Sequence, residues 1–248
     1  MHSIKKSDHF KYNNKLFKQL IPIYDPVASL LFPVRNAITK LFDGKESQKV
    51  IDIACGTGTQ AILIARKGHL VTGVDISPDM INRARKKGSS IKVSFEINDA
   101  SNIRYPDSTF DSAIISFALH DMPHTMRQKV VKEMERIVKP NGMLIFADYR
   151  GRSCDLIRKC IYWITKTWES RYYEDFLNKG LDYYIGENIR EITRNNYLLG
   201  EMEVIVFLKN RVEKTPYRCY HALYERTRAY GAIAHGKPTH RHRSDGLI

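Results

Sequence analysis

Over residues 49–99 the sequence alternates between short runs typical of buried strands and longer stretches with helical spacing. This alternation predicts βαβ units, and hence a parallel sheet covered by helices, because parallel neighbours need a long crossover connection. In order, the expected elements are KVIDIA, TQAILIARKG, HLVTGVD, SPDMINRARKKG and IKVSFEIND. Ser77 followed by Pro78 marks the start of the second helix, since serine is a favoured N-cap and proline suits the first helical position.

The same pattern continues after residue 99. Following a loop (ASNIRYPDST), we expect a strand FDSAIISFA, a helix HTMRQKVVKEMERIVKP, a Pro-Asn-Gly turn at 140–142 and a strand MLIFADY. Two further strands, around REITR and LLGEMEVIVFLK, complete an expected sheet of seven strands.

The remaining segments are predicted to surround this sheet. Helical stretches at about 11–20 and 26–42 would form an N-terminal cover of residues 1–45. The sheet and its helices would occupy 46–209, interrupted by an amphipathic, aromatic insertion at 151–189 that we expect to form two helices. A tail rich in Arg, His and Tyr follows at 210–248. A chain of 248 residues is long enough for one good-sized core with such additions.

The charge of the chain is concentrated at its ends. Its net charge is +13; the first forty residues hold seven basic and two acidic side chains, and the last thirty-nine hold eight and three. Basic termini favour weak contact with nucleic acid or an anionic membrane.

No apolar run approaches the roughly 18 residues of a membrane span, and no secretory signal is recognised, so we expect a cytoplasmic protein without a transmembrane segment. Four scattered cysteines lack metal-ligand spacing, so no metal site is predicted; oligomeric state stays open.

A glycine-rich loop follows the first predicted strand. Gly56, Gly58 and Ala61 fit the dinucleotide-binding pattern GxGxxG/A, and Asp75 ends the next strand about twenty residues later. Glycines there let the backbone turn tightly and approach a ligand, and a carboxylate at the second strand accepts hydrogen bonds from ribose hydroxyls. These features alone are equally compatible with NAD.

Residues 50–58 (VIDIACGTG) resemble the first motif of class I S-adenosylmethionine (SAM)-dependent methyltransferases. The acidic residue, Asp52, suits the ammonium group of SAM and would repel a pyrophosphate. Its alternative role is to bind neighbouring backbone N–H groups. Ala54 replaces the first glycine of the family motif, and its methyl group is compatible with that position if its φ is negative.

Later segments resemble the further motifs of the family, in the family's order. Residues 74–80 (VDISPDM) resemble the ribose-binding motif, 98–100 the adenine-binding motif, 116–120 the segment beside the methionine end of the cofactor, and IVKPNGMLIFADYR the fifth-strand motif. The resemblance spans about 20–209 and is closest to ubiquinone/menaquinone-biosynthesis and related small-molecule methyltransferases. It implies a Rossmann-like α/β fold with a seven-stranded, mostly parallel sheet and SAM contacts from Tyr24, Asp52, Ala54, Cys55, Gly56, Thr57, Gly58, Asp75, Ile76, Met80, Asp99, Ala100, Ser116, Phe117 and Ala118.

Candidate catalytic residues follow the fourth and fifth predicted strands. A general base is needed only when the methyl acceptor is protonated. His120 and Asp121 come directly after the fourth strand, where ligands bind in α/β sheets, and Tyr149 and Arg150 leave the fifth strand at the same edge. His120 could instead cap the following helix or lie against the cofactor.

The aromatic insertion lies where this family builds its substrate lid, so the resemblance implies a small, apolar or aromatic acceptor. Packing into the core explains the same side chains equally well. The residues concerned are Tyr162, Trp163, Trp168, Tyr172, Tyr173, Phe176, Tyr183 and Tyr184.

Three other functions stay open at this point. The basic ends also fit a nucleic-acid methyltransferase or an RNA-binding protein. The glycine pattern fits an NAD-dependent oxidoreductase, for which Asp52 is unfavourable. A SAM-binding or lipid-surface protein without catalytic activity would use the same basic ends and would not need His120.

Overall fold

The structure is a computed structural model that describes residues 31–150 and 170–211. These residues lie in the first of two compact units, Met1–Arg211; the second unit, Val212–Ile248, lies outside the described residues. Also outside them are the predicted helix at 11–20, Tyr24, the first half of the aromatic insertion and almost all of the basic tail.

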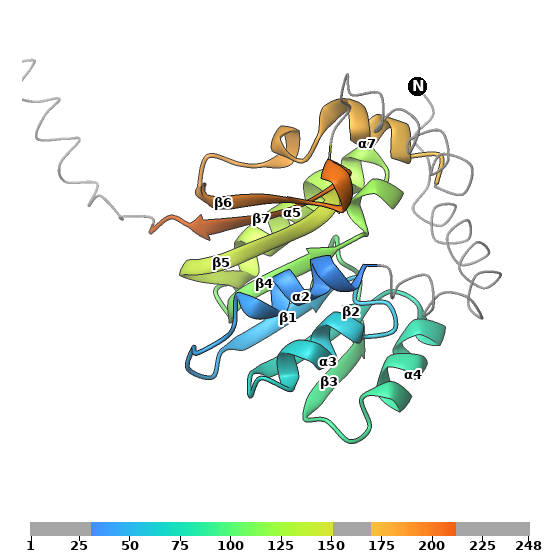
Figure 1. Cartoon of the computed structure of the whole chain (residues 1–248), viewed down its shortest axis with the longest axis vertical. Coiled ribbons are helices and arrows are strands. Elements are labelled where there is room, and N and C mark those ends of the chain that lie inside the picture. Colours follow the sequence, from blue (N-terminus) through green and yellow to red (C-terminus); the bar gives the residue numbers. More distant parts are fainter. Residues whose placement is uncertain (1–30, 151–169, 212–248) are drawn as a thin grey trace, which may run out of the picture. The chain divides into compact units, whose positions relative to one another are not determined.

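A seven-stranded sheet forms the centre of the first unit, with the order β3-β2-β1-β4-β5-β7-β6 (Figure 1). The pairs β1–β2, β2–β3, β1–β4 and β4–β5 are parallel, whereas β7 is antiparallel to both β5 and β6. The predicted seven-stranded, mostly parallel, Rossmann-like sheet is therefore confirmed. The strands are β1 (Lys49–Ile53), β2 (Leu70–Asp75), β3 (Val93–Ile97), β4 (Phe110–Ser116), β5 (Val138–Tyr149), β6 (Ile189–Tyr197) and β7 (Met202–Lys209).

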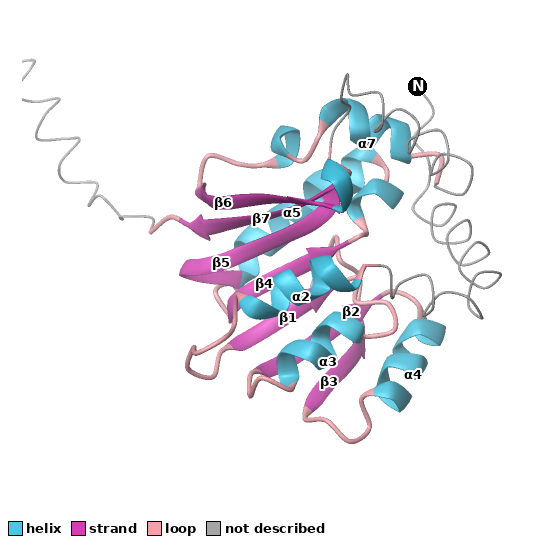
Figure 2. Ribbon diagram, in the orientation of Figure 1, coloured by secondary structure: helices cyan, strands magenta, loops and turns pink. Residues whose placement is uncertain are grey.

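Helices cover both faces of the sheet, because alternate strand residues point to opposite sides and both sides are apolar (Figure 2). One core joins α2 (Phe32–Lys40), α3 (Thr59–Ala65) and α4 (Pro78–Lys87) to residues such as Val50 and Ile114. The other joins α5 (His124–Ile137) and α7 (Tyr173–Lys179) to residues such as Ile51 and Ile115. Short 3₁₀ helices, η1 (Leu119–Asp121), η2 (Asp182–Tyr184) and η3 (Leu198–Gly200), complete the described part.

Helix α4 begins as predicted. Ser77 is its N-cap, and the serine hydroxyl accepts a hydrogen bond from the Met80 backbone N–H at 3.5 Å. Pro78 occupies the first turn, where its missing N–H costs nothing. The described part of the predicted helix at 26–42 is α2, which likewise has Pro33 in its first turn. A proline in the first turn thus marks the start of both helices.

Two short segments differ from the sequence prediction. The turn expected at 140–142 is an irregularity inside β5: Phe110 pairs with Val138, but Ser112 pairs with Met143, and Asn141 has a φ of 62°. Residues 198–200 were predicted as part of a strand and instead form η3, in which all three residues have positive φ. At 198–200 a local backbone reversal overrides the apolar pattern, whereas at 140–142 the strand continues past the predicted turn.

Candidate cofactor site and catalytic cluster

Every predicted site residue in the described part lies at or just beyond the carboxyl end of a strand. Strands β1 to β5 are parallel, so these ends meet at one edge of the sheet. The chain builds β2 and β3 on one side of β1 and then places β4 and β5 on the other side. Open α/β sheets bind ligands at such a reversal of strand order, because the loops there diverge.

The loop after β1 has an unusual backbone. Ala54, Gly56 and Gly58 all have positive φ, at 54°, 55° and 76°. The condition set from the sequence for an alanine at position 54, a negative φ, is therefore not met: the chain turns directly after β1, and residue 54 adopts the left-handed conformation that costs about 1–2 kcal/mol for an L-residue with a side chain. At Gly58 a Cβ atom would lie 2.5 Å from Cζ of Phe95, so the loop packs on β3 only because this residue is glycine.

Asp75, at the end of β2, is held against this loop. Its Oδ2 accepts a hydrogen bond from the Gly56 backbone N–H and its Oδ1 one from the Ser77 N–H, both at 2.9 Å. Burial raises the pKa of this carboxyl group, while the backbone donors oppose the rise. Each carboxylate oxygen can accept a further hydrogen bond, so the geometry is compatible with the predicted contact to ribose hydroxyls.

Asp52 is a buried carboxyl group that is only half satisfied. It is 1% exposed, and its Oδ2 accepts a hydrogen bond from the Ala61 backbone N–H at 3.1 Å. Its Oδ1 has no hydrogen-bond partner among residues 31–150 and 170–211. Burial raises its pKa to about 7, although the nearby Arg35 guanidinium acts in the opposite direction. The alternative role considered from the sequence, in which Asp52 only binds backbone N–H groups, therefore explains the contacts of one of its two oxygens.

Arg35, on α2, was counted in the sequence only as one of many basic residues. It is buried, its guanidinium carbon lies 5.9 Å from the Phe117 ring centroid, and its Nε has no partner within the described part of the chain. Gln60 on α3 donates to the Arg35 carbonyl and to Thr39, and its own Oε1 is also unpaired there. Buried polar atoms without partners cost about 1–3 kcal/mol each, so this small region favours a polar ligand.

The other predicted cofactor residues surround this region. Cys55 stays a thiol at neutral pH, because burial and the charges of Asp52 and Asp75 raise its pKa. Asp99, after β3, accepts hydrogen bonds at Oδ1 from the backbone and hydroxyl of Ser101. Thr57, Met80 and Ala100 are buried, and Ile76 is exposed. Ser116 ends β4, and Phe117, at a φ of 54°, and Ala118 follow it. Their contacts with a cofactor stay predictions.

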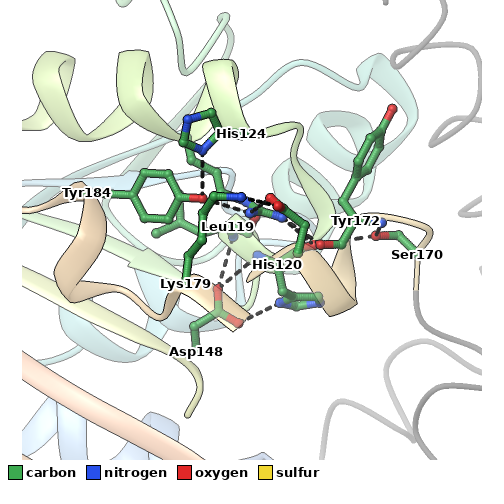
Figure 3. Close-up of polar contacts among 10 residues, drawn as sticks. Leu119, His120, His124, Asp148, Ser170, Tyr172, Lys179 and Tyr184 are labelled. Carbon is green, nitrogen blue, oxygen red and sulfur yellow. Dashed lines mark hydrogen bonds and ion pairs between the residues drawn. The ribbon is translucent and has the colours of Figure 1, made fainter. Parts of the chain in front are cut away.

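A second cluster lies at the ends of β4 and β5 (Figure 3). The Nδ1 atom of His120 lies 2.6 Å from Oδ1 of Asp148, and its Nε2 lies 3.5 Å from Oδ2 of Asp121. The Tyr149 ring stands edge-on to the imidazole at a centroid distance of 4.9 Å. Of the predicted catalytic residues, His120, Asp121 and Tyr149 thus lie together, and Asp148 is a partner that the sequence reasoning missed.

Arg127, on α5, was also missed, and it connects this cluster to the aromatic insertion. Its side chain is 0% exposed and donates to the Leu119 carbonyl at 2.9 Å, the Tyr172 carbonyl at 2.7 Å and the Asp175 carboxylate at 2.8 Å. It also donates to the hydroxyl of Tyr184 at 2.9 Å. A single buried guanidinium therefore ties η1 to α7 and η2.

The described half of the aromatic insertion is mainly core. Tyr172, Tyr173, Phe176 and Tyr184 are buried, whereas Tyr183 is 57% exposed. Tyr162, Trp163 and Trp168 lie outside the described residues.

Within 31–150 and 170–211, no group of three or more His, Cys, Asp and Glu side chains is arranged to hold a metal ion, and no helix is both long and apolar enough to cross a membrane.

The sheet order, the glycine-rich loop and the acidic residues at the ends of β1 and β2 define a Rossmann-like domain of the methyltransferase type. Residues 50–142 match a family described as "Methyltransferase domain". This chain is similar to the demethylmenaquinone methyltransferase of Corynebacterium kroppenstedtii, with 35% identity over 115 residues, or 46% of this chain and 48% of the relative. It is also similar to that of Listeria monocytogenes, with 32% identity over 147 residues, or 54% and 61%. Over residues 50–142 the chain is thus similar to methyltransferase domains.

Solved structures share the fold at lower identity. The N-methyltransferase NodS from Bradyrhizobium japonicum, in complex with S-adenosyl-L-homocysteine, has 17% identity and a TM-score of 0.53 over 72% of this chain and 87% of NodS. A putative methyltransferase of Haloferax volcanii, in complex with the activator Trm112, has 15% identity and a TM-score of 0.60 over 79% and 97%. The chain spans between 48% and 61% of the length of the curated relatives described above.

Proposed function

We propose that this chain transfers the methyl group of SAM to a small acceptor. The observation that carries the proposal is the buried Oδ1 of Asp52, which has no partner in the described residues and lies at the reversal of strand order beside the glycine-rich loop. A buried carboxylate oxygen of this kind suits a cation, and SAM carries an ammonium group. NAD would bring a pyrophosphate to the same place, and two anions in a confined site repel each other.

The chain offers a partner for each polar part of SAM. Asp52 would bind the ammonium group, and the Arg35 guanidinium, with its unpaired Nε, would bind the carboxylate. Asp75 would accept hydrogen bonds from the ribose hydroxyls, and Asp99 would accept one from the adenine amino group. When bound, SAM supplies a methyl group activated by the sulfonium charge; the residues of the chain bind and orient both reactants.

The acceptor in this proposal is small and apolar or aromatic. Tyr149 and Tyr173 stand edge-on to each other at a centroid distance of 4.9 Å beside His120, and they would form an aromatic wall. The relatives above are named for demethylmenaquinone, so a flat, apolar quinone-type acceptor is one member of this class.

We further propose the domain organisation predicted from the sequence: a cover at 1–45, the methyltransferase domain at 46–209 with a lid at 151–189, and a basic tail at 210–248. The tail would provide only weak contact with nucleic acid or anionic membrane. Salt-sensitive binding to RNA or anionic vesicles should disappear when 210–248 is deleted, whereas SAM binding should persist. Loss of SAM binding on that deletion would contradict this division.

Methyl transfer from radiolabelled SAM to a metabolite extract, compared with RNA and total-lipid fractions, tests the proposed function. We expect protein-dependent label in small molecules and its loss with Asp52→Asn. Asp111→Asn is the matched control, because Asp111 lies at the start of β4 and binds Lys139 and the Lys49 N–H instead. Label in RNA alone would favour the nucleic-acid methyltransferase, and no label in any fraction would overturn the proposal.

A further inference from the structure

His120 is held between two carboxylates in a buried position. It is 4% exposed, with Asp148 at Nδ1 and Asp121 near Nε2. Within residues 31–150 and 170–211, charged or titratable groups that face it include the rings of Tyr149 and Tyr173 and the Arg127 guanidinium, whose Nη2 donates to the His120 carbonyl at 3.5 Å. No other histidine in the described residues has a carboxylate within 4 Å of either ring nitrogen.

Asp148 is arranged to fix the tautomer of this ring. Its Oδ2 accepts the backbone N–H groups of Leu119 at 3.0 Å and His120 at 3.3 Å, and its Oδ1 accepts the Tyr149 N–H at 2.8 Å. With three backbone N–H groups donating to its two oxygens, the Asp148 carboxylate also acts as the acceptor in its contact with the ring. The proton between Asp148 and His120 therefore belongs to Nδ1, and the lone pair of the neutral ring is at Nε2.

We propose that His120 is the general base for methyl transfer and that Asp148 and Arg127 are positioning residues. This inference rests on the proposed function. The acceptor's X–H bond breaks, its proton moves to Nε2, and the freed electron pair on X forms the bond to the methyl carbon as the carbon–sulfur bond breaks. The sulfur keeps that electron pair as a neutral thioether, and Nε2 later releases its proton to water. Asp148 and Asp121 stabilise the intermediate imidazolium.

This assignment restricts the acceptor to a group that is protonated at neutral pH, such as a hydroxyl or a carbon acid. A group that is already nucleophilic gains nothing from a base. Arg127 contributes by geometry: its bond to the Leu119 carbonyl at 2.9 Å fixes η1, and its own charge is balanced by Asp175. A purely structural His120–Asp148 pair would hold β4 to β5 equally well, but it would not control the pH dependence of the reaction.

The test combines His120→Asn and Asp148→Asn with a matched histidine control, His69→Gln. His69 is buried at the other end of the sheet, where its ring nitrogens bind the Gln48 N–H and the Phe42 carbonyl. Calorimetric titration with S-adenosyl-L-homocysteine checks the cofactor site first. We expect the wild type and the three variants to bind it with affinities within about twofold of one another. Failure of the wild type to bind would overturn the proposed function, which is a different outcome from failure of His120 as the general base.

Nitrogen NMR of labelled histidines then follows the His120 ring without any acceptor. We expect a protonated Nδ1 in the neutral ring, and a fall in the His120 pKa of at least one unit in Asp148→Asn. An Nε2-protonated neutral ring, or a pKa unchanged by Asp148→Asn, would overturn the proposal.

With the acceptor recovered from the extract, kcat/KM should fall tenfold per pH unit below the His120 pKa measured by NMR. The acid limb should shift with that pKa in Asp148→Asn and stay in place in His69→Gln, even where the latter unfolds at lower temperature. His120→Asn should lower kcat about 10²–10⁴-fold. A loss below threefold, or an acid limb unrelated to the NMR titration, would overturn the assignment.

Discussion

Asp52→Asn should make the protein without cofactor more stable at neutral pH and should weaken its cofactor binding. The carboxyl group is fully buried, one of its oxygens is unpaired in the described residues, and its pKa is raised to about 7 from an ordinary value of 3.8. Because the folded-state pKa is the higher one, the folded protein retains a proton that the unfolded chain releases. Its stability therefore falls as pH rises from about 4 to about 7.

The size of the effect follows from that shift. About three pKa units correspond to about 4 kcal/mol of destabilisation above pH 7, which the neutral amide removes. The amide nitrogen brings a donor that needs a partner, at a cost of about 1–3 kcal/mol. A net gain of about 2 kcal/mol remains, which corresponds to a rise in Tm of about 4–8 °C for a chain of this length. At pH 4 the charge penalty is nearly gone and the cost of the amide donor remains, so the variant should be about 1–3 kcal/mol less stable than the wild type.

Thermal unfolding at pH 4 and pH 8, with Asp111→Asn as the exposed control, measures this stability difference. Cofactor binding should strengthen as pH rises, opposite to stability. Between pH 6 and pH 7 the ionised fraction of Asp52 rises from about one tenth to about one half. S-adenosyl-L-homocysteine should therefore bind about fivefold more tightly at pH 7 than at pH 6. Asp52→Asn should bind at least tenfold more weakly and without this dependence. A variant that is less stable at pH 8 yet binds with unchanged affinity would refute the reasoning.

Three further substitutions probe the backbone and the buried network. Gly58→Ala should lose about 2–4 kcal/mol in urea unfolding, because φ is 76° and the new Cβ would lie 2.5 Å from Phe95; no loss would mean that the loop rearranges freely. Ala54→Gly should change stability by less than about 1 kcal/mol, since relief of the left-handed alanine is offset by a more flexible unfolded chain, and a larger loss would argue against strain. Arg127→Leu should lose about 2–6 kcal/mol in the same assay by leaving the Leu119 and Tyr172 carbonyls without their donor, whereas a neutral effect would show that water replaces the guanidinium.

The alternation of strands and helices in this fold could be predicted because it depends on repeated local patterns. Alternating apolar runs and helical spacing specify βαβ units, and the Ser77-Pro78 pair specifies the start of α4 from local chemistry alone. The φ of Ala54 could not be predicted in the same way. It depends on the direction that the chain takes after β1, which is set by packing of the loop against β2 and β3.

The catalytic cluster shows a similar division. His120 and Tyr149 were predicted because they lie at or after the ends of predicted strands, and Asp148 had the same signal, since it stands next to Tyr149 at the end of MLIFADY. In the structure, the pairing of Ser116 with Ala147 places residue 148 beside the end of β4. Arg35 and Arg127 carried no such signal. Their roles arise from contacts between segments far apart in the chain, such as the Arg127 bond to Asp175.

Calorimetric titration of the full chain with S-adenosyl-L-homocysteine and, separately, with NAD⁺ tests the central claim most directly. We expect one site for S-adenosyl-L-homocysteine, at least tenfold weaker binding in Asp75→Asn, and no heat of binding with NAD⁺. Binding of NAD⁺ without binding of S-adenosyl-L-homocysteine, or an affinity unchanged by Asp75→Asn, would contradict a SAM site at the carboxyl edge of β1 and β2.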